Sequence, residues 1–223
     1  MTKTKLTSDK YIYTSAVHNF GSDAVLLHDF MEQKYKNKTV CELGTGCGII
    51  SFMMSQKAKQ IYAVDIQKDA IELLEKSIEQ NKIKNITPIC TDLRNLTPLS
   101  SLLTSNCDIV VINPPYKKLN TGKMYENDGK NIARFEICCT PDDICAAAKK
   151  LLKPMGSLFL CYRPERLADI ICSMRNYGIE PKRLKLTPKL ILLEGKKGAK
   201  SGIQIIRNSE FGIRNDFSFC SGD

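Results

Sequence analysis

The feature that most constrains the fold is an alternation of apolar runs and helical stretches that begins at Thr39. The apolar runs are short and rich in β-branched residues, which is typical of strands, whereas the stretches between them repeat apolar residues every three to four positions. Strand, helix and strand repeated in this order form βαβ units, which build a parallel sheet with helices on its faces. The chain is therefore predicted to have an α/β fold.

Local signals place the individual elements. In the first half, strands are predicted at 39–43, 60–65, 86–91 and 108–113, and helices at 22–36, 48–57 and 68–81. In the second half, helices are predicted at 141–152 and 164–176, and strands at 157–162, 181–186, 189–194 and 202–206. Ser22 is expected to cap the first helix, Pro141 to begin a later one, and Gly178 to end the last.

Composition narrows the setting of this fold. A chain of 223 residues suits one compact domain. It has 10 cysteines but no Cys-x-x-Cys pair, so no metal site is expected. Five of them lie in or beside apolar runs and are expected to be reduced core residues: Cys41, Cys90, Cys107, Cys161 and Cys172. With no signal peptide and no membrane span recognisable, we expect a cytoplasmic protein. The residues leave open whether it is a monomer or a weak dimer.

The charge balance points to a class of partner. Lys and Arg number 33 against 24 Asp and Glu, which gives a net charge of +9 spread along the chain. This excess suits a phosphate-rich partner such as a nucleic acid, although solubility alone is the alternative explanation.

A glycine-rich loop follows the first predicted strand and opens a helix. Its sequence, from Glu42 to Gly48, is Glu-Leu-Gly-Thr-Gly-Cys-Gly. Gly44, Gly46 and Gly48 allow tight turns and close approach of a ligand. The spacing is Gly-x-Gly-x-Gly with an acidic residue directly before it, unlike the Gly-x-Gly-x-x-Gly of dinucleotide binders. The loop therefore favours S-adenosylmethionine over NAD.

Two carboxylates end the next two predicted strands. Asp65 follows Gly44 by 21 residues and is the candidate acceptor for ribose hydroxyls. Asp92 is the candidate acceptor for the adenine amino group of the cofactor. We expect the residues that follow them, Ile66 and Leu93, to contact the cofactor as well.

The fourth predicted strand ends in Asn113-Pro114-Pro115-Tyr116. This is the carboxyl edge of the sheet, where ligands of open α/β folds bind. An exocyclic amine on an aromatic ring is a poor nucleophile because its lone pair is delocalised. Acceptors on Asn113 and on the Pro114 carbonyl can bind its two hydrogens and restore the lone pair, while Pro115 fixes the carbonyl and Tyr116 stacks on the base.

Together these motifs resemble the amino-group methyltransferases of the Rossmann-like class. Three further segments, 19–27, 133–140 and 162–169, make the chain similar to the bacterial tRNA(Val) adenosine-37 N6-methyltransferases. The resemblance implies a class I methyltransferase fold with a mostly parallel seven-stranded sheet, S-adenosylmethionine as cofactor and tRNA as partner. The chain departs from the family at Cys47 and in its last residues, from Asn208.

The resemblance also implies a domain plan. Residues 1–38 form an N-terminal extension and a helix that cover the cofactor, with contacts from Phe20, Ser22 and Asp23. Residues 39–207 form the methyltransferase domain, and 208–223 are an unassigned tail. Basic residues around the catalytic motif would bind RNA: Lys117, Lys118, Lys123, Lys130, Arg134, Arg163 and Arg166.

Several other functions remain open from the residues. Enzymes that methylate a glutamine amide in release factors share the Asn-Pro-Pro-Tyr motif, but about 38 residues before the first strand are too few for their helical substrate domain. Guanine N2 methylation of rRNA and adenine methylation of DNA are further enzymatic alternatives. A non-catalytic RNA-binding module is the alternative from another class; it has no physical need for Asn113.

Overall fold

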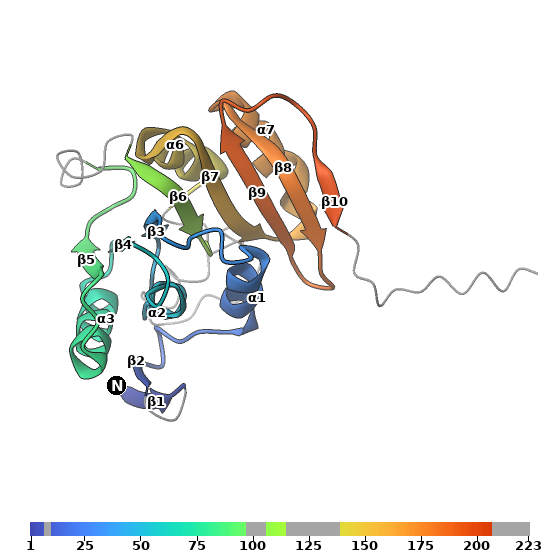
Figure 1. Ribbon diagram of the computed structural model, residues 1–223. Helices are drawn as coiled ribbons and strands as arrows, with labels where there is room; N and C mark the ends of the chain where they lie inside the picture. Colours follow the sequence, from blue (N-terminus) through green and yellow to red (C-terminus); the bar gives the residue numbers. More distant parts are fainter. Residues whose placement is uncertain (7–9, 97–105, 115–138, 207–223) are drawn as a thin grey trace, which may run out of the picture.

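The computed structural model describes residues 1–6, 10–96, 106–114 and 139–206 (Figure 1). Its main sheet has eight strands in the order β10-β8-β9-β7-β6-β3-β4-β5. Their bounds are β3 Thr39–Leu43, β4 Gln60–Asp65, β5 Ile86–Cys90, β6 Cys107–Ile112, β7 Leu152–Tyr162, β8 Ile179–Leu186, β9 Ile191–Lys197 and β10 Gln204–Ile206. Strand β9 is antiparallel to both β7 and β8, and all other neighbours are parallel. The mostly parallel α/β fold is thereby confirmed, and β10 lies within the strand predicted at 202–206. The main sheet has eight strands, not the seven that the family resemblance implied.

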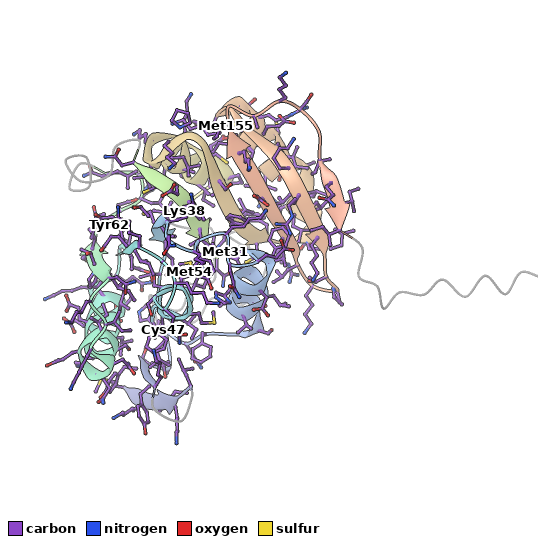
Figure 2. The ribbon with its side chains drawn as sticks, viewed as in Figure 1. Met31, Lys38, Cys47, Met54, Tyr62 and Met155 are labelled. Atoms are coloured by element: carbon purple, nitrogen blue, oxygen red, sulfur yellow. The ribbon has the colours of Figure 1, made fainter. Side chains whose placement is uncertain are left out.

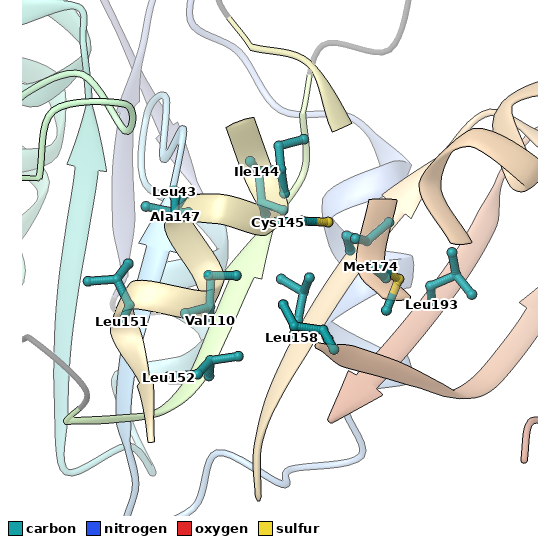
Figure 3. Close-up of a cluster of buried hydrophobic side chains, with 14 of the residues drawn as sticks. Leu43, Val110, Ile144, Cys145, Ala147, Leu151, Leu152, Leu158, Met174 and Leu193 are labelled. Atoms are coloured by element: carbon teal, nitrogen blue, oxygen red, sulfur yellow. The ribbon is translucent and has the colours of Figure 1, made fainter. Parts of the chain in front are cut away.

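Helices cover both faces of this sheet. Helices α6 (Pro141–Leu151) and α7 (Leu167–Asn176) pack on one face, where Ile144, Leu158 and Met174 belong to one buried cluster (Figure 3). Helices α1 (Ser22–Phe30), α2 (Ile49–Met54) and α3 (Lys68–Asn81) pack on the other face. Side chains alternate between the two clusters along each central strand, as the two-residue period of a strand requires. The sheet is therefore buried on both sides.

The order of the strands fixes where a ligand can bind. From β3 the chain moves outward in one direction to β4 and β5, then returns to β6 and β7 on the other side of β3. Such a reversal opens a crevice outside the carboxyl ends of the strands. The predicted glycine loop follows β3, and Asn113 directly follows β6, so both motifs lie at this crevice.

The N-terminal residues form a hairpin that the sequence pattern did not reveal. Strands β1 (Thr2–Lys5) and β2 (Tyr11–Thr14) pair antiparallel, apart from the main sheet. Side chains of α3 bind the backbone of β2: the Tyr11 N–H donates to Asn81 Oδ1 at 3.0 Å, and the Tyr13 N–H to Ser77 Oγ at 2.9 Å. Ile12 is buried against the α3 side of the core.

Several predicted boundaries were wrong. Helix α1 ends at Phe30 rather than at residue 36, because Glu32 and Gln33 adopt left-handed backbone angles. Its N-cap is Gly21, and Ser22 makes no capping bond there. Helix α2 is confined to Ile49–Met54, and residues 164–166 form a 3-10 turn, η1 (Pro164–Arg166), before α7.

The cysteine prediction holds for some positions only. Cys41, Cys107 and Cys161 are fully buried, whereas Cys90 and Cys172 are exposed at the surface. Cys90 is the last residue of the edge strand β5, where the sheet no longer covers it. All eight cysteines in the described ranges are free thiols. Within those same ranges, no helix is long and apolar enough to cross a bilayer.

Candidate functional site

The glycine loop makes a tight, left-handed path from β3 into α2. Gly44, Gly46 and Gly48 have φ angles of 66°, 55° and 84°, a region that other residues rarely adopt. A Cβ atom at Gly44 or Gly46 would meet nothing within 4 Å, so the space above them is open. At Gly48 a Cβ would lie 2.4 Å from Leu74 Cδ1, so this glycine is needed for packing against α3.

Glu42 fixes this loop by hydrogen bonds to the loop and to the following helix, α2. Its Oε2 atom accepts hydrogen bonds from Thr45 Oγ1 at 2.8 Å, from the Ser51 N–H at 2.9 Å and from Ser51 Oγ. The side chain is buried, and burial raises the pKa of the Glu42 carboxyl to about 7 against the pull of these bonds. Because all three bonds go to Oε2, the other oxygen is the one that can face a ligand.

Asp65 holds the loop from the end of β4. Its Oδ2 accepts from the Gly46 N–H at 2.8 Å, and its Oδ1 accepts from the Gln67 N–H at 3.0 Å. Burial raises the pKa of this carboxyl, while the two backbone bonds and nearby His18 oppose the rise. Each oxygen keeps lone-pair capacity for a second donor, such as a ribose hydroxyl.

Asp92 has a different environment from Asp65. It forms a paired contact with Arg94, which donates from Nε to both carboxylate oxygens at 3.0 Å and from Nη2 to Oδ2 at 2.6 Å. The Arg94 N–H also donates to Oδ1 at 2.8 Å. These bonds lower the pKa of the carboxyl. A further donor would have to compete with Arg94 for the same lone pairs.

Asn113 lies at the end of β6 next to Cys161 of β7. The Cys161 thiol donates to the Asn113 side-chain oxygen at 2.8 Å. Burial, helped by the charge of Asp23, raises the pKa of the thiol, so it stays protonated. Pro114 follows Asn113 at the same edge and lines the same pocket.

One pocket at the carboxyl edge of the sheet brings these motifs together. The predicted cofactor and catalytic residues that line it are Phe20, Glu42, Gly44, Gly46, Asp65, Ile66, Asp92, Leu93, Asn113 and Pro114. Cys47, labelled in Figure 2, is buried at its wall, and burial raises the pKa of its thiol to about 12. Ser22, Asp23 and Gly48 do not line the pocket, although Asp23 is near enough to Cys161 to affect its pKa.

His18 is a pocket residue that sequence reasoning missed. Its buried side chain lines the pocket, and its Nε2 lies 3.0 Å from Asp69 Oδ2. Its partner is 51 residues away on α3, and no local motif announces such a pair.

Of the predicted RNA-binding residues, the structure describes two. Arg163 pairs with Glu165 at 3.2 Å, and Arg166 pairs with Asp169 at 2.6 Å and lies over the ring of Tyr162. The others lie outside the described residues, as do two catalytic candidates: Lys117, Lys118, Lys123, Lys130, Arg134, Pro115 and Tyr116. Across the described chain, no group of three His, Cys, Asp or Glu side chains could hold a metal ion.

The residues present fit S-adenosylmethionine. The open space above Gly44 and Gly46 can admit a ligand close to the backbone, and the buried carboxyl groups of Glu42 and Asp65 lie beside it. The ligand has hydroxyls for Asp65 to accept from and a positive sulfur that carboxylates favour. At the far end of the pocket, Asn113 offers an acceptor to a second molecule.

Comparison with known proteins agrees with this geometry. The sequence model of the methyltransferase small domain family matches residues 3–169. A tRNA1(Val) (adenine(37)-N6)-methyltransferase of Parabacteroides distasonis is 28% identical over 165 residues, which cover 73% of this chain and 67% of that protein. The enzyme of the same name from Tolumonas auensis is 25% identical over 193 residues, covering 81% of this chain and 78% of that one.

Solved structures share the fold. A SAM-dependent methyltransferase of Aquifex aeolicus superposes with a TM-score of 0.58 at 14% identity, over 75% of this chain and 87% of that one. The tRNA m1G37 methyltransferase of M. jannaschii gives 0.60 at 20% identity, over 89% and 57%. A Streptococcus mutans protein in complex with SAH gives 0.56 at 20% identity, over 80% and 99%. At these identities the likeness concerns the fold alone.

Proposed function

The chain belongs to the methyltransferase small domain family, and from that membership we propose that it methylates the exocyclic N6 of an adenine in tRNA, with adenosine 37 of tRNA Val as the target. The reaction is S-adenosylmethionine-dependent. The observation that carries the proposal is Asn113 at the end of β6, in the same pocket as the glycine loop. The named function of the two relatives supports the choice of RNA and position. A tRNA substrate also fits a cytoplasmic location.

The cofactor end of the pocket works by positioning. Bound S-adenosylmethionine supplies a methyl group on a positively charged sulfur. Asp65 would accept from the ribose hydroxyls, the glycine loop would leave room for the amino-acid part, and Ile66 and Leu93, which line the same pocket, would contact the cofactor. Phe20 covers the ligand from the N-terminal side, because it lines the pocket directly before α1.

The other end activates the amine. Asn113 Oδ1 and the Pro114 carbonyl accept the two hydrogens of the adenine amino group, so the nitrogen lone pair leaves the ring and turns toward the methyl group. Pro115 and Tyr116 lie outside the described residues; from the sequence motif alone, Pro115 would fix the carbonyl and Tyr116 would stack on the extruded base. Forming the bond from nitrogen to the methyl carbon would break the methyl–sulfur bond and leave a neutral thioether on the cofactor. The nitrogen, which takes over the positive charge, would then release a proton to water. No general base is needed.

Basic side chains near the β6 end of the pocket would contact the RNA. Arg163 and Arg166 follow β7, the neighbour of β6, at the same edge of the sheet, and each keeps its local carboxylate partner. Together with the basic residues from Lys117 to Arg134 they would contact phosphates without reading sequence.

The test is methyl transfer from labelled S-adenosylmethionine to unmodified total tRNA, with unmodified rRNA and release factor in parallel. N6-methyladenosine in tRNA alone is expected. Label in the release factor would replace the proposal by glutamine methylation, and N2-methylguanosine in rRNA would replace it by guanine methylation. Absence of label from all three, with intact cofactor binding, would favour a binding module. The Asn113→Ala variant serves as the inactive control.

A further inference from the structure

We propose that Cys161 is a positioning residue for methyl transfer, which holds the Asn113 carboxamide with its oxygen turned toward the amine that is methylated. This inference rests on the proposed function, because it assigns Asn113 Oδ1 the task of accepting an amine hydrogen. It adds a residue from another strand that no motif in the sequence identifies.

The strand register brings the two side chains together. Strands β6 and β7 are parallel, and Ile112 pairs with Leu160, so Asn113 and Cys161 are the next positions along. Cys161 belongs to the same face as Val111 and Phe159, which is the face that Asn113 shares by the two-residue period of a strand. The result is the 2.8 Å contact between Cys161 Sγ and Asn113 Oδ1.

The chemistry of the contact is directional. A carboxamide has an acceptor at one end and a donor at the other, and rotating it by half a turn exchanges them. The buried thiol is protonated, so it presents a hydrogen to Oδ1. The oxygen has two lone pairs, and the thiol occupies one of them. The second remains for the amine hydrogen, with the carboxamide already in its working orientation.

Plain packing is the competing explanation, and it makes different predictions. If Cys161 only filled space, Cys161→Ala and Cys161→Ser would both lower kcat because each side chain is smaller than cysteine. Removing Asn113 would not change that loss. If it donates to Asn113, serine should replace it and alanine should not. The effect of alanine should then disappear when Asn113 is absent.

The experiment compares Cys161→Ala, Cys161→Ser and Asn113→Ala with the double variant Cys161→Ala/Asn113→Ala. One neutral hydrogen bond corresponds to a roughly three- to tenfold change, so Cys161→Ala is expected to lower kcat by that factor with KM for tRNA and Kd for S-adenosylmethionine unchanged. Cys161→Ser should stay within about twofold of the parent, and the double variant should equal Asn113→Ala. Cys145→Ala, a buried thiol on α6 away from the pocket, is the matched control.

Equal losses in the alanine and serine variants, or an alanine effect that persists without Asn113, would overturn the proposal. A second measurement, by NMR, does not depend on turnover, so it tests the role of Cys161 even if tRNA is the wrong substrate. The side-chain amide signals of Asn113, assigned by their loss in Asn113→Ala, are expected to shift in Cys161→Ala and stay in place in Cys145→Ala. Unmoved signals in Cys161→Ala would also overturn it, whereas inactivity of the parent on tRNA would count against the proposed function alone.

Discussion

The two ends of the pocket are built in different ways. At the cofactor end, Glu42 and Asp65 hold the glycine loop through four bonds to its backbone and side chains and to the start of α2, and both carboxylates are buried. At the end of β6, the described contact of the Asn113 side chain is the one from the Cys161 thiol. The cofactor end is thus held by several bonds, whereas the β6 end presents one acceptor that a single described contact orients. Binding and turnover should therefore respond to different substitutions.

The largest effect should come from the β6 end. Asn113→Ala is expected to lower kcat by about 100-fold or more, because it removes an interaction that strengthens in the transition state. Cofactor affinity should change less than twofold, which titration calorimetry would measure beside single-turnover rates. Asn176→Ala, an exposed position on α7, is the control. If Asn113→Ala weakened cofactor binding but turned over normally at saturating cofactor, Asn113 would belong to the cofactor site, and the two ends would not differ in function.

The cofactor end should respond in affinity. Asp65→Asn is expected to weaken binding of S-adenosylmethionine by about 10- to 100-fold, since hydrogen bonds to a charged acceptor are worth roughly 1.5–3 kcal/mol. At saturating cofactor the rate should recover most of its parent value. Asp29→Asn, an exposed carboxylate on α1, is the control. An unchanged dissociation constant would remove Asp65 from the ribose site.

Glu42 should make the stability of the protein depend on pH. Its folded-state pKa of about 7 lies above the ordinary value of 4.5, so the folded protein holds more protons than the unfolded chain between these values. The free energy of unfolding should therefore fall as pH rises from about 4.5 to 7, by at most about 3 kcal/mol. Glu42→Gln should flatten this segment in urea titrations at pH 5, 6 and 7, and exposed Glu75→Gln should not. Identical slopes in parent and Glu42→Gln would refute this.

The smallest effect concerns Arg94. If Asp92 accepts from the adenine amino group, Arg94 competes with the cofactor for the lone pairs of Asp92. Arg94→Ala should then tighten cofactor binding. The gain should be only about two- to threefold, because an exposed ion pair such as Arg94–Asp92 is weak. Fluorescence titration of S-adenosylmethionine against parent and variant would detect this. Weaker binding would show instead that Arg94 positions Asp92 for the ligand.

The sequence predicted what local patterns encode. Glycines at Gly44, Gly46 and Gly48 indicated the left-handed loop, and apolar runs located the central strands, because both depend on neighbours in the chain. The long-range contacts of two pocket-lining residues, His18 and Asn113, have no such pattern. His18 with Asp69 and Asn113 with Cys161 are 51 and 48 residues apart, and only the packed fold brings them together. The hairpin was also missed. Its two strands are close in the chain, but β2 is bonded on its other side to Asn81 and Ser77 of α3, which are 70 and 64 residues away from their partners.

The attachment of the hairpin to α3 also reaches the pocket. Tyr11 and Tyr13 are bonded to Asn81 and Ser77 near the C-terminal end of this helix, and His18 meets Asp69 in its first turn. The chain between Tyr13 and His18 is therefore attached to α3 at both ends. Residues 17–21, which line the pocket, directly continue this attached segment of the chain. Weakening the pairing of β1 with β2 would therefore allow residues 17–21 to move. These residues line the cofactor pocket, whereas no residue of β1 or β2 does.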